Sequence, residues 1–559
     1  MPEAATGVGM PERRDRTVLA VVGVTLLAFA VRLVALDARP FHWSEGRVGY
    51  WALRFAETGA YEYRPVAGGP LVAVATRWAI ELFGASDAVA RAPVALLTGL
   101  TPLAALLFRG PLDDRETVGL AGVVAFQPVV VYYSRFLRGD ALAAGLGLTV
   151  LGGAVRYRRR GDWWALPLAG GGLAAAVAAS GFAVAYLLVA PVAALFVLDE
   201  ARVRGVPERA RRTLFGDDDH PPAHERLAAH ATPVARGSLV FVAVWYVLFA
   251  PRAPGLAPGL SDPTRIFSVA GAAFEGAARS FWEYRVVYRL QPHTPGRHGL
   301  IEHALPLVET AVRVAPVTLA AGVVGFFSER YRSDTRPLVA LGGYATLWGV
   351  FVLAIATPEP QPWVAVHFVA FAALPAAVGL ARVASALRRW ARVDEPARVA
   401  LALSVVVAAV AVAGPTLAAP YAPPERGSAF TQYAQPTDDP GELVPAVERA
   451  TADNTGVDVL YVAPQFDTRQ EYDTPPIAAA DHEQWGNRLP LQWYFERGGV
   501  ETDSAFNLSY LPRDAETVPV VVTTPRYADG TAGRLQGEYT RHRLQLGVHS
   551  RNVTVFVRQ

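Results

Sequence analysis

The chain has 559 residues but neither cysteine nor lysine, and these two absences already exclude several kinds of protein. Without cysteine it can form no disulfide, offer no thiolate nucleophile and bind no metal through sulfur. All 52 basic residues are arginines, and 50 acidic residues balance them, so the formal net charge is only +2. A nucleic-acid-binding domain carries a clear basic excess. We therefore expect no nucleic acid among its partners.

The hydrophobic residues make up 52% of the chain and gather in long blocks. Blocks of about 17–25 residues suit a helix that crosses about 30 Å of hydrocarbon. The sequence therefore predicts a polytopic α-helical protein of the cell membrane, with a transmembrane domain over residues 17–420. The stretch 163–198 fits one long helix or two short ones. Arg32 either snorkels to the interface or pairs with a buried acidic group. The eleven expected helices cover 17–36, 88–108, 117–133, 140–156, 163–179, 181–198, 237–254, 303–328, 337–356, 363–386 and 398–419.

Arginines cluster in alternate connections between these blocks and set the expected orientation. The N-terminal tail, residues 1–16, carries three of them, which places it in the cytoplasm by the positive-inside rule. No small-residue cleavage site follows the first block, so we treat it as an uncleaved helix. An odd number of helices then places the C-terminus outside, with two long outer loops at 37–87 and 255–302. The first loop contains two short helical patterns, at 46–58 and 71–83.

The composition changes after the last apolar block. Residues 421–559 contain no long apolar run and hold 19 acidic residues against 12 arginines. Strand patterns at 457–463, 518–523 and 552–557, with a helical pattern near 489–497, predict a small extracellular α/β domain. Its acidity, together with the arginine-only, alanine- and valine-rich composition, points to a salt-loving archaeon.

The stretch His42–Trp51 lies where the first helix emerges from the membrane. It combines Glu45 with His42, Arg47 and three large aromatic side chains. A carboxylate here can act as a general base or help to hold a metal ion, and burial against the aromatic rings would raise the pKa of Glu45 toward a useful range. The alternative is an exposed glutamate paired with Arg47.

A second polar cluster, Tyr132–Asp140, lies between the third and fourth predicted helices, on the same outer side. Its two arginines, Arg135 and Arg138, suit a lipid-linked phosphate because a guanidinium group stays charged and offers a bidentate fork. The alternative is structural: Asp140 caps the next helix and the arginines meet lipid headgroups.

The second outer loop contains a third candidate. Its aromatic part, residues 281–285, predicts a helix that lies in the membrane interface. His298, Glu302 and His303 are weak candidates for a metal site, because positions four apart share a face of a helix. Interfacial anchoring and capping of the next helix is the alternative.

Together, these stretches resemble the GT-C-type membrane glycosyltransferases, of which the protein O-mannosyltransferases are one branch. They are most similar to the haloarchaeal "flippase activity-associated" family, which is linked to protein glycosylation. The likeness covers most of the chain and is strongest over residues 37–140. Besides His42–Trp51 and Tyr132–Asp140, it rests on Tyr61–Pro65, Gly69–Pro70, Gly84–Arg91 and Pro490–Phe495.

The resemblance implies a sugar on a polyprenyl (dolichyl) phosphate, delivered outside the cell to a protein or glycan acceptor. The resemblance fixes no cofactor and is compatible with a divalent metal ion, magnesium or manganese. Two departures stand out: Ser44 replaces an aspartate, and Gly68 replaces a histidine. A serine cannot supply the charge of a carboxylate base. The implied catalytic residues are Glu45 and Asp140, and the implied substrate-binding residues are His42, Ser44, Arg47, Arg64, Tyr133, Arg135 and Arg138.

Two functions follow as hypotheses. The first is a glycosyltransferase in which Glu45 assists the acceptor and Arg138 stabilises the leaving phosphate. The second is a non-catalytic accessory that binds the lipid-linked sugar and assists its flipping or handover, which Ser44 and Gly68 favour. A transporter ranks last, because the helix centres hold few charges and no inverted repeat is evident.

Overall fold

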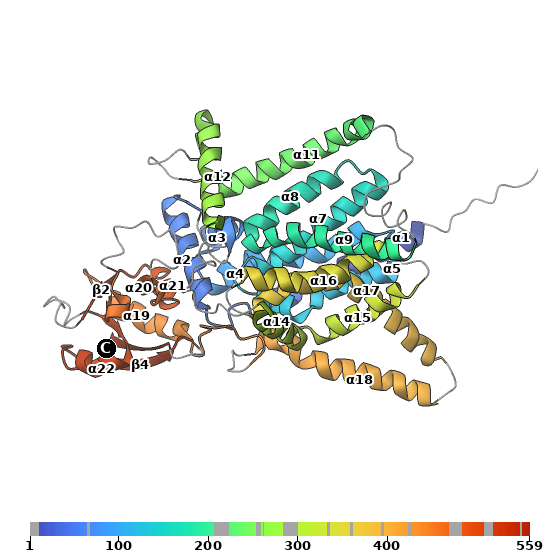
Figure 1. Ribbon diagram of the computed structural model, residues 1–559. Coiled ribbons are helices and arrows are strands. Elements are labelled where there is room, and N and C mark those ends of the chain that lie inside the picture. The colour runs from blue at the N-terminus through green and yellow to red at the C-terminus, as the bar shows by residue number, and fades with distance from the viewer. Residues whose placement is uncertain are drawn as a thin grey trace, which may run out of the picture.

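The computed structural model consists of a bundle of long helices with a smaller α/β domain at one end (Figure 1). We call the end that carries this domain the domain end of the bundle. The first residues of α1 lie at the opposite end (Figure 1). The structure describes residues 11–63, 68–205, 223–252, 259–260, 262–282, 300–332, 336–357, 361–392, 396–422, 428–468, 483–507, 518–547 and 551–559.

Each predicted apolar block is helical. The helices of the bundle are α1 (Pro11–Leu33), α4 (Asp87–Gly99) with the 3-10 helix η1 (Thr101–Phe108), α5 (Asp114–Phe126), α6 (Pro128–Ser134), α7 (Asp140–Arg160), α8 (Ala165–Ala179), η2 (Gly181–Ala185) with α9 (Tyr186–Val203), α11 (Ala223–Phe249), α14 (Leu300–Val314), α15 (Pro316–Arg330), α16 (Pro337–Ala356), η5 (Pro362–Val364) with α17 (Ala365–Trp390), and α18 (Pro396–Ala418). The stretch 163–198 forms two helices, α8 and α9, separated by Ser180.

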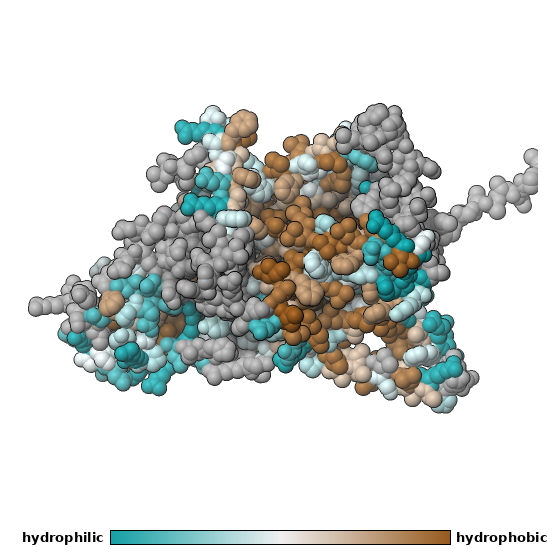
Figure 2. All heavy atoms as spheres, viewed as in Figure 1, coloured by the Kyte–Doolittle hydropathy of each residue, from teal (hydrophilic) through white to brown (hydrophobic). Residues whose placement is uncertain are grey.

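The number of membrane spans is lower than the eleven expected. Among the described residues, seven helices are long and apolar enough to cross a membrane, and nine spans result if each of two bent pairs is one span. The α5–α6 pair bends by 48° and the α14–α15 pair by 101°. The helix α8 has only 15 residues, and α7 is not among the candidate spans. Hydrophobic side chains form a broad belt over the middle of the bundle (Figure 2), as expected of a multi-pass membrane protein.

The break between α5 and α6 explains the charged residue in α1. Pro128 follows the break, and a proline cannot donate the hydrogen bond that would continue the helix. The freed carbonyl groups of Ala125 and Val124 accept hydrogen bonds from Arg32, at 2.8 Å and 3.3 Å. Arg32 is fully buried. It therefore neither snorkels nor meets an acidic group, because backbone carbonyls at a broken helix are its partners.

Small residues let the central helices approach closely. The helix α17 packs against α5, α7, α15 and α16. A Cβ atom at Gly325 would lie 1.8 Å from the Pro375 carbonyl oxygen, and one at Gly379 would lie 1.9 Å from that of Ala321. Glycine at these positions therefore permits backbone contact, which drives helix association where lipid removes the hydrophobic driving force.

An ion-pair network joins the helices at the end opposite the domain. Glu329 of α15 is 1% exposed and accepts from Arg336 at 2.9 Å and also from Arg382. Arg336 also donates to Glu116 of α5 at 2.6 Å and 2.9 Å. One network therefore fastens four helices, and its arginines are partly exposed.

Two short helices, α2 (Trp43–Thr58) and α3 (Gly69–Phe83), lie between the bundle and the α/β domain (Figure 1). They confirm the two helical patterns expected in the first loop. A further helix, α12 (Ile266–Trp282), follows α11 and lies across its direction (Figure 1). Phe267 and Phe274 of α12 are 90% and 66% exposed, which suits a helix in contact with lipid.

The α/β domain is built on a five-stranded mixed sheet in the order β2-β1-β3-β5-β4. Neighbouring strands β2, β1 and β3 are parallel, and β5 runs antiparallel to both β3 and β4. Three strands and the helical pattern near 489–497 confirm the prediction, whereas β2 and β4 were not foreseen. The elements are α19 (Val444–Thr451), β1 (Val459–Val462), α20 (Glu483–Gly486), α21 (Leu491–Glu496), β2 (Thr502–Ala505), β3 (Val520–Thr523), α22 (Pro525–Ala532), β4 (Tyr539–Gln545) and β5 (Asn552–Arg558).

Candidate functional site

The residues that carry the predicted chemistry meet at the domain end, where α2 begins. His42 precedes the helix and caps it: its Nδ1 accepts from the Ser44 backbone N–H at 3.0 Å and lies 2.8 Å from Ser44 Oγ. Its Nε2 lies 2.6 Å from the carbonyl oxygen of Tyr433. A carbonyl only accepts, so Nε2 carries the proton and the Ser44 hydroxyl donates to Nδ1. Burial lowers the pKa of His42 to about 4, which keeps the ring neutral at pH 7.

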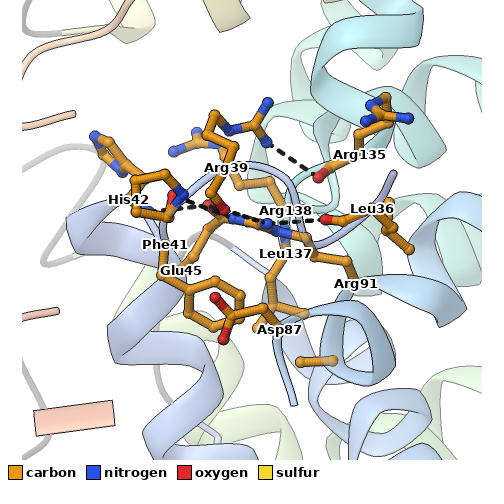
Figure 3. Close-up of polar contacts among 12 residues, drawn as sticks. Leu36, Arg39, Phe41, His42, Glu45, Asp87, Arg91, Arg135, Leu137 and Arg138 are labelled. Atoms are coloured by element: carbon orange, nitrogen blue, oxygen red, sulfur yellow. Dashed lines mark hydrogen bonds and ion pairs between the residues drawn. The ribbon is translucent and has the colours of Figure 1, made fainter. Parts of the chain in front are cut away.

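Glu45 is completely buried, and donors surround both of its oxygens (Figure 3). Arg91 forms a bidentate pair with it, at 2.8 Å from Nε and 2.8 Å from Nη2. The backbone N–H groups of Leu137 and His42 donate at 2.8 Å and 2.9 Å. Glu45 therefore joins three segments: the approach to α2, the first turns of α4 and the link between α6 and α7.

Two expectations about Glu45 are wrong. It is neither exposed nor paired with Arg47, because Arg91 occupies both of its oxygens. The pKa of Glu45 is also not raised: burial works in that direction, but the Arg91 charge and the four hydrogen bonds bring the pKa below its usual value. A carboxylate in this state is ionised, yet its oxygens already accept hydrogen bonds from the protein.

Arg91 was assigned no role from the sequence, although it lies within one of the stretches that carry the family likeness. Besides Glu45, it donates to the carbonyl oxygens of Leu36 and Arg39, at 3.0 Å and 2.8 Å. The signal in the sequence was a lone arginine inside an apolar span, which seldom occurs without a buried partner. Arg91 thus fixes both the chain that leaves α1 and the carboxylate that begins α2.

A second carboxylate–arginine pair lies next to Ser44. Arg138 Nε donates to Asp140 Oδ2 at 2.9 Å, and its Nη1 donates to Ser44 Oγ at 3.3 Å. The guanidinium group lies over the Trp363 ring, 4.4 Å from its centre. Ser44, Arg138 and Asp140 therefore meet, whereas Glu45, the other catalytic carboxylate of the predicted site, is held by Arg91.

Asp140 also contacts two residues that the sequence did not indicate. Its Oδ1 accepts from the Ser180 hydroxyl at 2.9 Å and lies 3.2 Å from His367 Nε2. The other ring nitrogen of His367 lies 2.6 Å from the Tyr186 hydroxyl. A chain of polar groups therefore runs from Asp140 to Tyr186. Nothing in the sequence relates these distant positions, because three separate helix ends bring them together.

Two glycines allow these helix ends to meet. A Cβ atom at Gly139 would lie 1.8 Å from the Ala179 carbonyl oxygen, and one at Gly69, whose φ is +58°, would lie 2.2 Å from that of Ala178. Gly68 is also crowded, since its Cβ would lie 3.0 Å from Val72 Cβ. A histidine at position 68 would therefore displace neighbouring side chains.

Of the other predicted substrate-binding residues, Arg135 and Tyr133 donate to backbone carbonyl groups. Arg135 donates to carbonyl groups at the end of α1, including those of Val34 at 2.5 Å and Ala35 at 2.8 Å. The Tyr133 hydroxyl donates to the Phe430 carbonyl at 3.0 Å. Arg47 is buried with its guanidinium group 5.8 Å from the Trp43 ring centre. Arg64 lies outside the described residues.

The donor set does not fit a divalent cation. Within the described ranges, no three histidine or carboxylate side chains converge. Glu45 and Asp140 are each neutralised by an arginine, and Ser44 adds no charge. Glu302 is exposed, whereas His303 is buried with Nε2 3.2 Å from Thr357 Oγ1. The third member of that weak metal candidate, His298, lies outside the described residues.

The α/β domain is fastened to the same region through α21. Asp87, in the first turn of α4, accepts from Trp493 Nε1 at 2.9 Å and from the Tyr494 hydroxyl at 2.8 Å, and it also pairs with Arg497. The Trp493 ring stacks on Phe41, with centres 5.0 Å apart. Asp87 and Arg91 are one helical turn apart, so a single turn of α4 holds both the domain and Glu45.

A family model matches the C-terminal part of the chain. Residues 441–558 match the family model of the Agl23 flippase-associated protein C-terminal domain. This match confirms the resemblance to flippase-associated proteins that the sequence indicated. No curated protein matches the chain.

Solved structures confirm that the fold is GT-C-like. The chain resembles ArnT from Cupriavidus metallidurans bound to undecaprenyl phosphate, with a TM-score of 0.51, 16% identity, and coverage of 96% of this chain and 97% of ArnT. The apo state of ArnT gives a TM-score of 0.51 at 16% identity, over 97% of this chain and 98% of that one. The oligosaccharyltransferase AglB from Archaeoglobus fulgidus, in complex with an inhibitory peptide and a dolichol-phosphate, gives 0.50 at 14% identity, over 94% of this chain and 71% of that one.

Proposed function

We propose that this protein binds a sugar carried on a polyprenyl phosphate at the domain end of its bundle and holds it for handover without transferring it. The observation that carries this proposal is the position of Ser44. Its hydroxyl lies between a neutral His42 ring and Arg138, at the position where the related pattern has a carboxylate. Similarity to proteins bound to undecaprenyl phosphate and dolichol-phosphate supports the ligand class.

The charges around Ser44 favour binding over catalysis. A general base needs a free lone pair within reach of the acceptor's proton. Glu45 accepts four hydrogen bonds, and Asp140 is shared by Arg138, Ser180 and His367. Arg138 still has an N–H group on each Nη nitrogen for a phosphate oxygen, because a guanidinium group carries five donors. The site is therefore rich in anion donors and poor in available base.

We further propose that the domain end faces the outside of the cell. The start of α1 lies at the opposite end, and the ion-pair network of Arg336 and Arg382 lies with it. The sugar would then be presented outside, next to the α/β domain.

A specific contact favours glycosyl transfer as a second candidate function. His367 and Asp140 form a buried pair at 3.2 Å, a combination that can accept and return a proton. In that case Asp140, and not Glu45, would be the catalytic carboxylate.

A paired assay of binding and transfer tests the proposal. We expect the wild type in nanodiscs to bind undecaprenyl phosphate, and Arg138→Met to weaken binding about tenfold or more, because a charge-assisted hydrogen bond is lost. Arg77→Met is the matched control, since Arg77 pairs with Glu81 on α3 at 2.7 Å. Equal binding by wild type and Arg138→Met would refute the placement of the phosphate. Sugar transfer by the wild type would establish the second candidate instead.

A further inference from the structure

Arg39 is a buried cation with no acidic partner in the described part of the chain. It lies in the chain between α1 and α2 and is 6% exposed. Among the described residues, its one hydrogen bond runs from Nη2 to the Arg135 carbonyl oxygen at 3.2 Å (Figure 3), and its Nε has no partner. Its guanidinium group lies over the Phe136 ring, 3.6 Å from the centre, and 5.2 Å from that of Tyr132.

The charges of the surrounding site do not neutralise it. Glu45 forms an ion pair with Arg91 at 2.8 Å, and Asp140 forms one with Arg138 at 2.9 Å. Arg39 and Arg135 remain, and Arg135 contacts only carbonyl groups and the Tyr421 ring. In the described part of the chain, this region therefore carries more buried positive than negative charge.

Arg39 and Arg135 are both buried, but they differ in how many backbone carbonyl groups they satisfy. Four backbone carbonyls at the end of α1 accept from Arg135, which satisfies groups that a helix end leaves open. Arg39 makes one hydrogen bond for the same burial. Burying a charge that is not fully paired costs stability, so a buried arginine with a single hydrogen bond suits a site that receives an anion.

The anion most consistent with this position is a phosphate. Arg39 donates to the Arg135 carbonyl and lies over the Phe136 ring, both in the link between α6 and α7 that also carries Arg138. Two guanidinium groups held at this link match the several oxygens of a phosphate monoester, which a planar fork binds well.

We propose that Arg39 is a second phosphate-binding residue, which holds the polyprenyl phosphate together with Arg138 at the approach to α2. This proposal rests on the proposed function for its lipid ligand, but the anion site itself rests on the charge and burial of Arg39. It assigns a role to a residue that the motifs did not single out.

The test compares Arg39→Met with Arg135→Met in phosphatidylcholine nanodiscs. Undecaprenyl phosphate is the probe, and undecaprenol, inorganic phosphate and nanodiscs containing phosphatidic acid are the other arms. We expect Arg39→Met to weaken undecaprenyl phosphate binding about tenfold to a hundredfold and to leave undecaprenol binding unchanged. Arg39→Lys keeps the charge but not the planar fork, so its affinity for undecaprenyl phosphate should lie between those of the wild type and Arg39→Met.

Melting temperature without ligand separates binding from a structural role. Arg39→Met should melt at or above the wild-type temperature and lose the stabilisation that undecaprenyl phosphate gives. Arg135→Met should melt several degrees lower, because it uncaps α1. A comparable fall for Arg39→Met, with wild-type phosphate binding, would overturn the proposal.

The remaining arms distinguish this inference from the proposed function. If the wild type ignores undecaprenyl phosphate but is stabilised by inorganic phosphate through Arg39, the anion site stands and the polyprenyl ligand is wrong. A response to phosphatidic acid in place of undecaprenyl phosphate would assign the site to bulk anionic lipid, and would refute the proposal as stated. If Arg138→Met loses binding and Arg39→Met does not, the proposed function stands and Arg39 is not its second contact.

Discussion

The two carboxylate–arginine pairs at the domain end lie close together but differ in what surrounds them. Glu45 receives two N–H groups from Arg91 and two from the backbone, all within 2.9 Å. The partners of Asp140 in the described part of the chain are side-chain groups: the Arg138 guanidinium, the Ser180 hydroxyl and the His367 ring. Backbone donors cannot move without moving the chain, whereas hydroxyl and imidazole side chains can rotate.

This difference separates a structural carboxylate from one that can respond to a ligand. The Glu45 pair is closed on itself and holds three segments in place. The Asp140 pair is linked through Arg138 to Ser44 and through Ser44 to His42, so a ligand at Arg138 would act on all of them. Asp140 is therefore the better candidate for a role in function, although the ten-residue stretch around Glu45 drew attention first.

The difference between the two pairs is tested most strongly by removing the arginine of each pair and comparing the losses of stability. Arg91→Met should lower the free energy of unfolding by about 3–5 kcal/mol, because it leaves Glu45 charged and buried. Arg138→Met should cost less than half of that, since Ser180 and His367 still contact Asp140. Thermal melting in detergent, calibrated by denaturant unfolding, measures both. Equal losses in the two variants would show that the pairs are equivalent.

The pH dependence of stability tests the neutral His42 ring that lies between the pairs. Its pKa is about 4 in the folded protein and 6.5 when unperturbed, so the unfolded chain binds the proton more readily. Stability is then fully present above pH 6.5 and falls by up to about 3 kcal/mol as the pH drops toward 4. Melting between pH 7 and 4.5 measures this loss.

The matched variant for this experiment is His42→Gln, which cannot titrate. It should melt at nearly the same temperature across that pH range. A wild-type curve as flat as that of His42→Gln would mean that His42 is not held neutral.

Restoring a carboxylate at position 44 tests whether the missing aspartate limits sugar transfer. Ser44→Asp places a base beside His42 and Arg138, and a positioned base contributes about a hundredfold or more to a transfer reaction. We expect transfer from a polyprenyl-phosphate sugar to rise by about that factor, with Ser44→Asn as the uncharged control. If neither variant shows transfer, a single missing carboxylate does not explain the loss of activity. High activity already in the wild type would favour Asp140 as the base.

Local patterns were enough to predict much of the architecture. Apolar blocks located each helix of the bundle, because hydrophobic thickness fixes a length that the sequence must supply. The alternation of β-branched residues located β1, β3 and β5. The count of spans was less successful, since the chain does not reveal that α14 and α15 meet at 101°.

The candidate site was predicted only in part. Arg138 and Asp140 meet Ser44 at the ends of α6 and α7, whereas Glu45, the other catalytic carboxylate of the predicted site, is paired with Arg91. The sequence did not indicate Arg91 or His367 as partners, since each is a single residue in an apolar helix. It also assigned Arg135 to the ligand, although the open carbonyls of α1 occupy it.

By itself, the sequence determined a multi-pass membrane protein with a polar cluster at the helix ends and an α/β domain after it. These features follow from hydrophobic length and residue order, which are local properties. The tertiary structure alone decided that Glu45 is neutralised by Arg91, that Asp140 meets His367, and that Arg39 is buried with no carboxylate among the described residues. The physical reason is that a charge acquires its role from the partners and the dielectric around it, and both depend on segments that lie far apart in the chain.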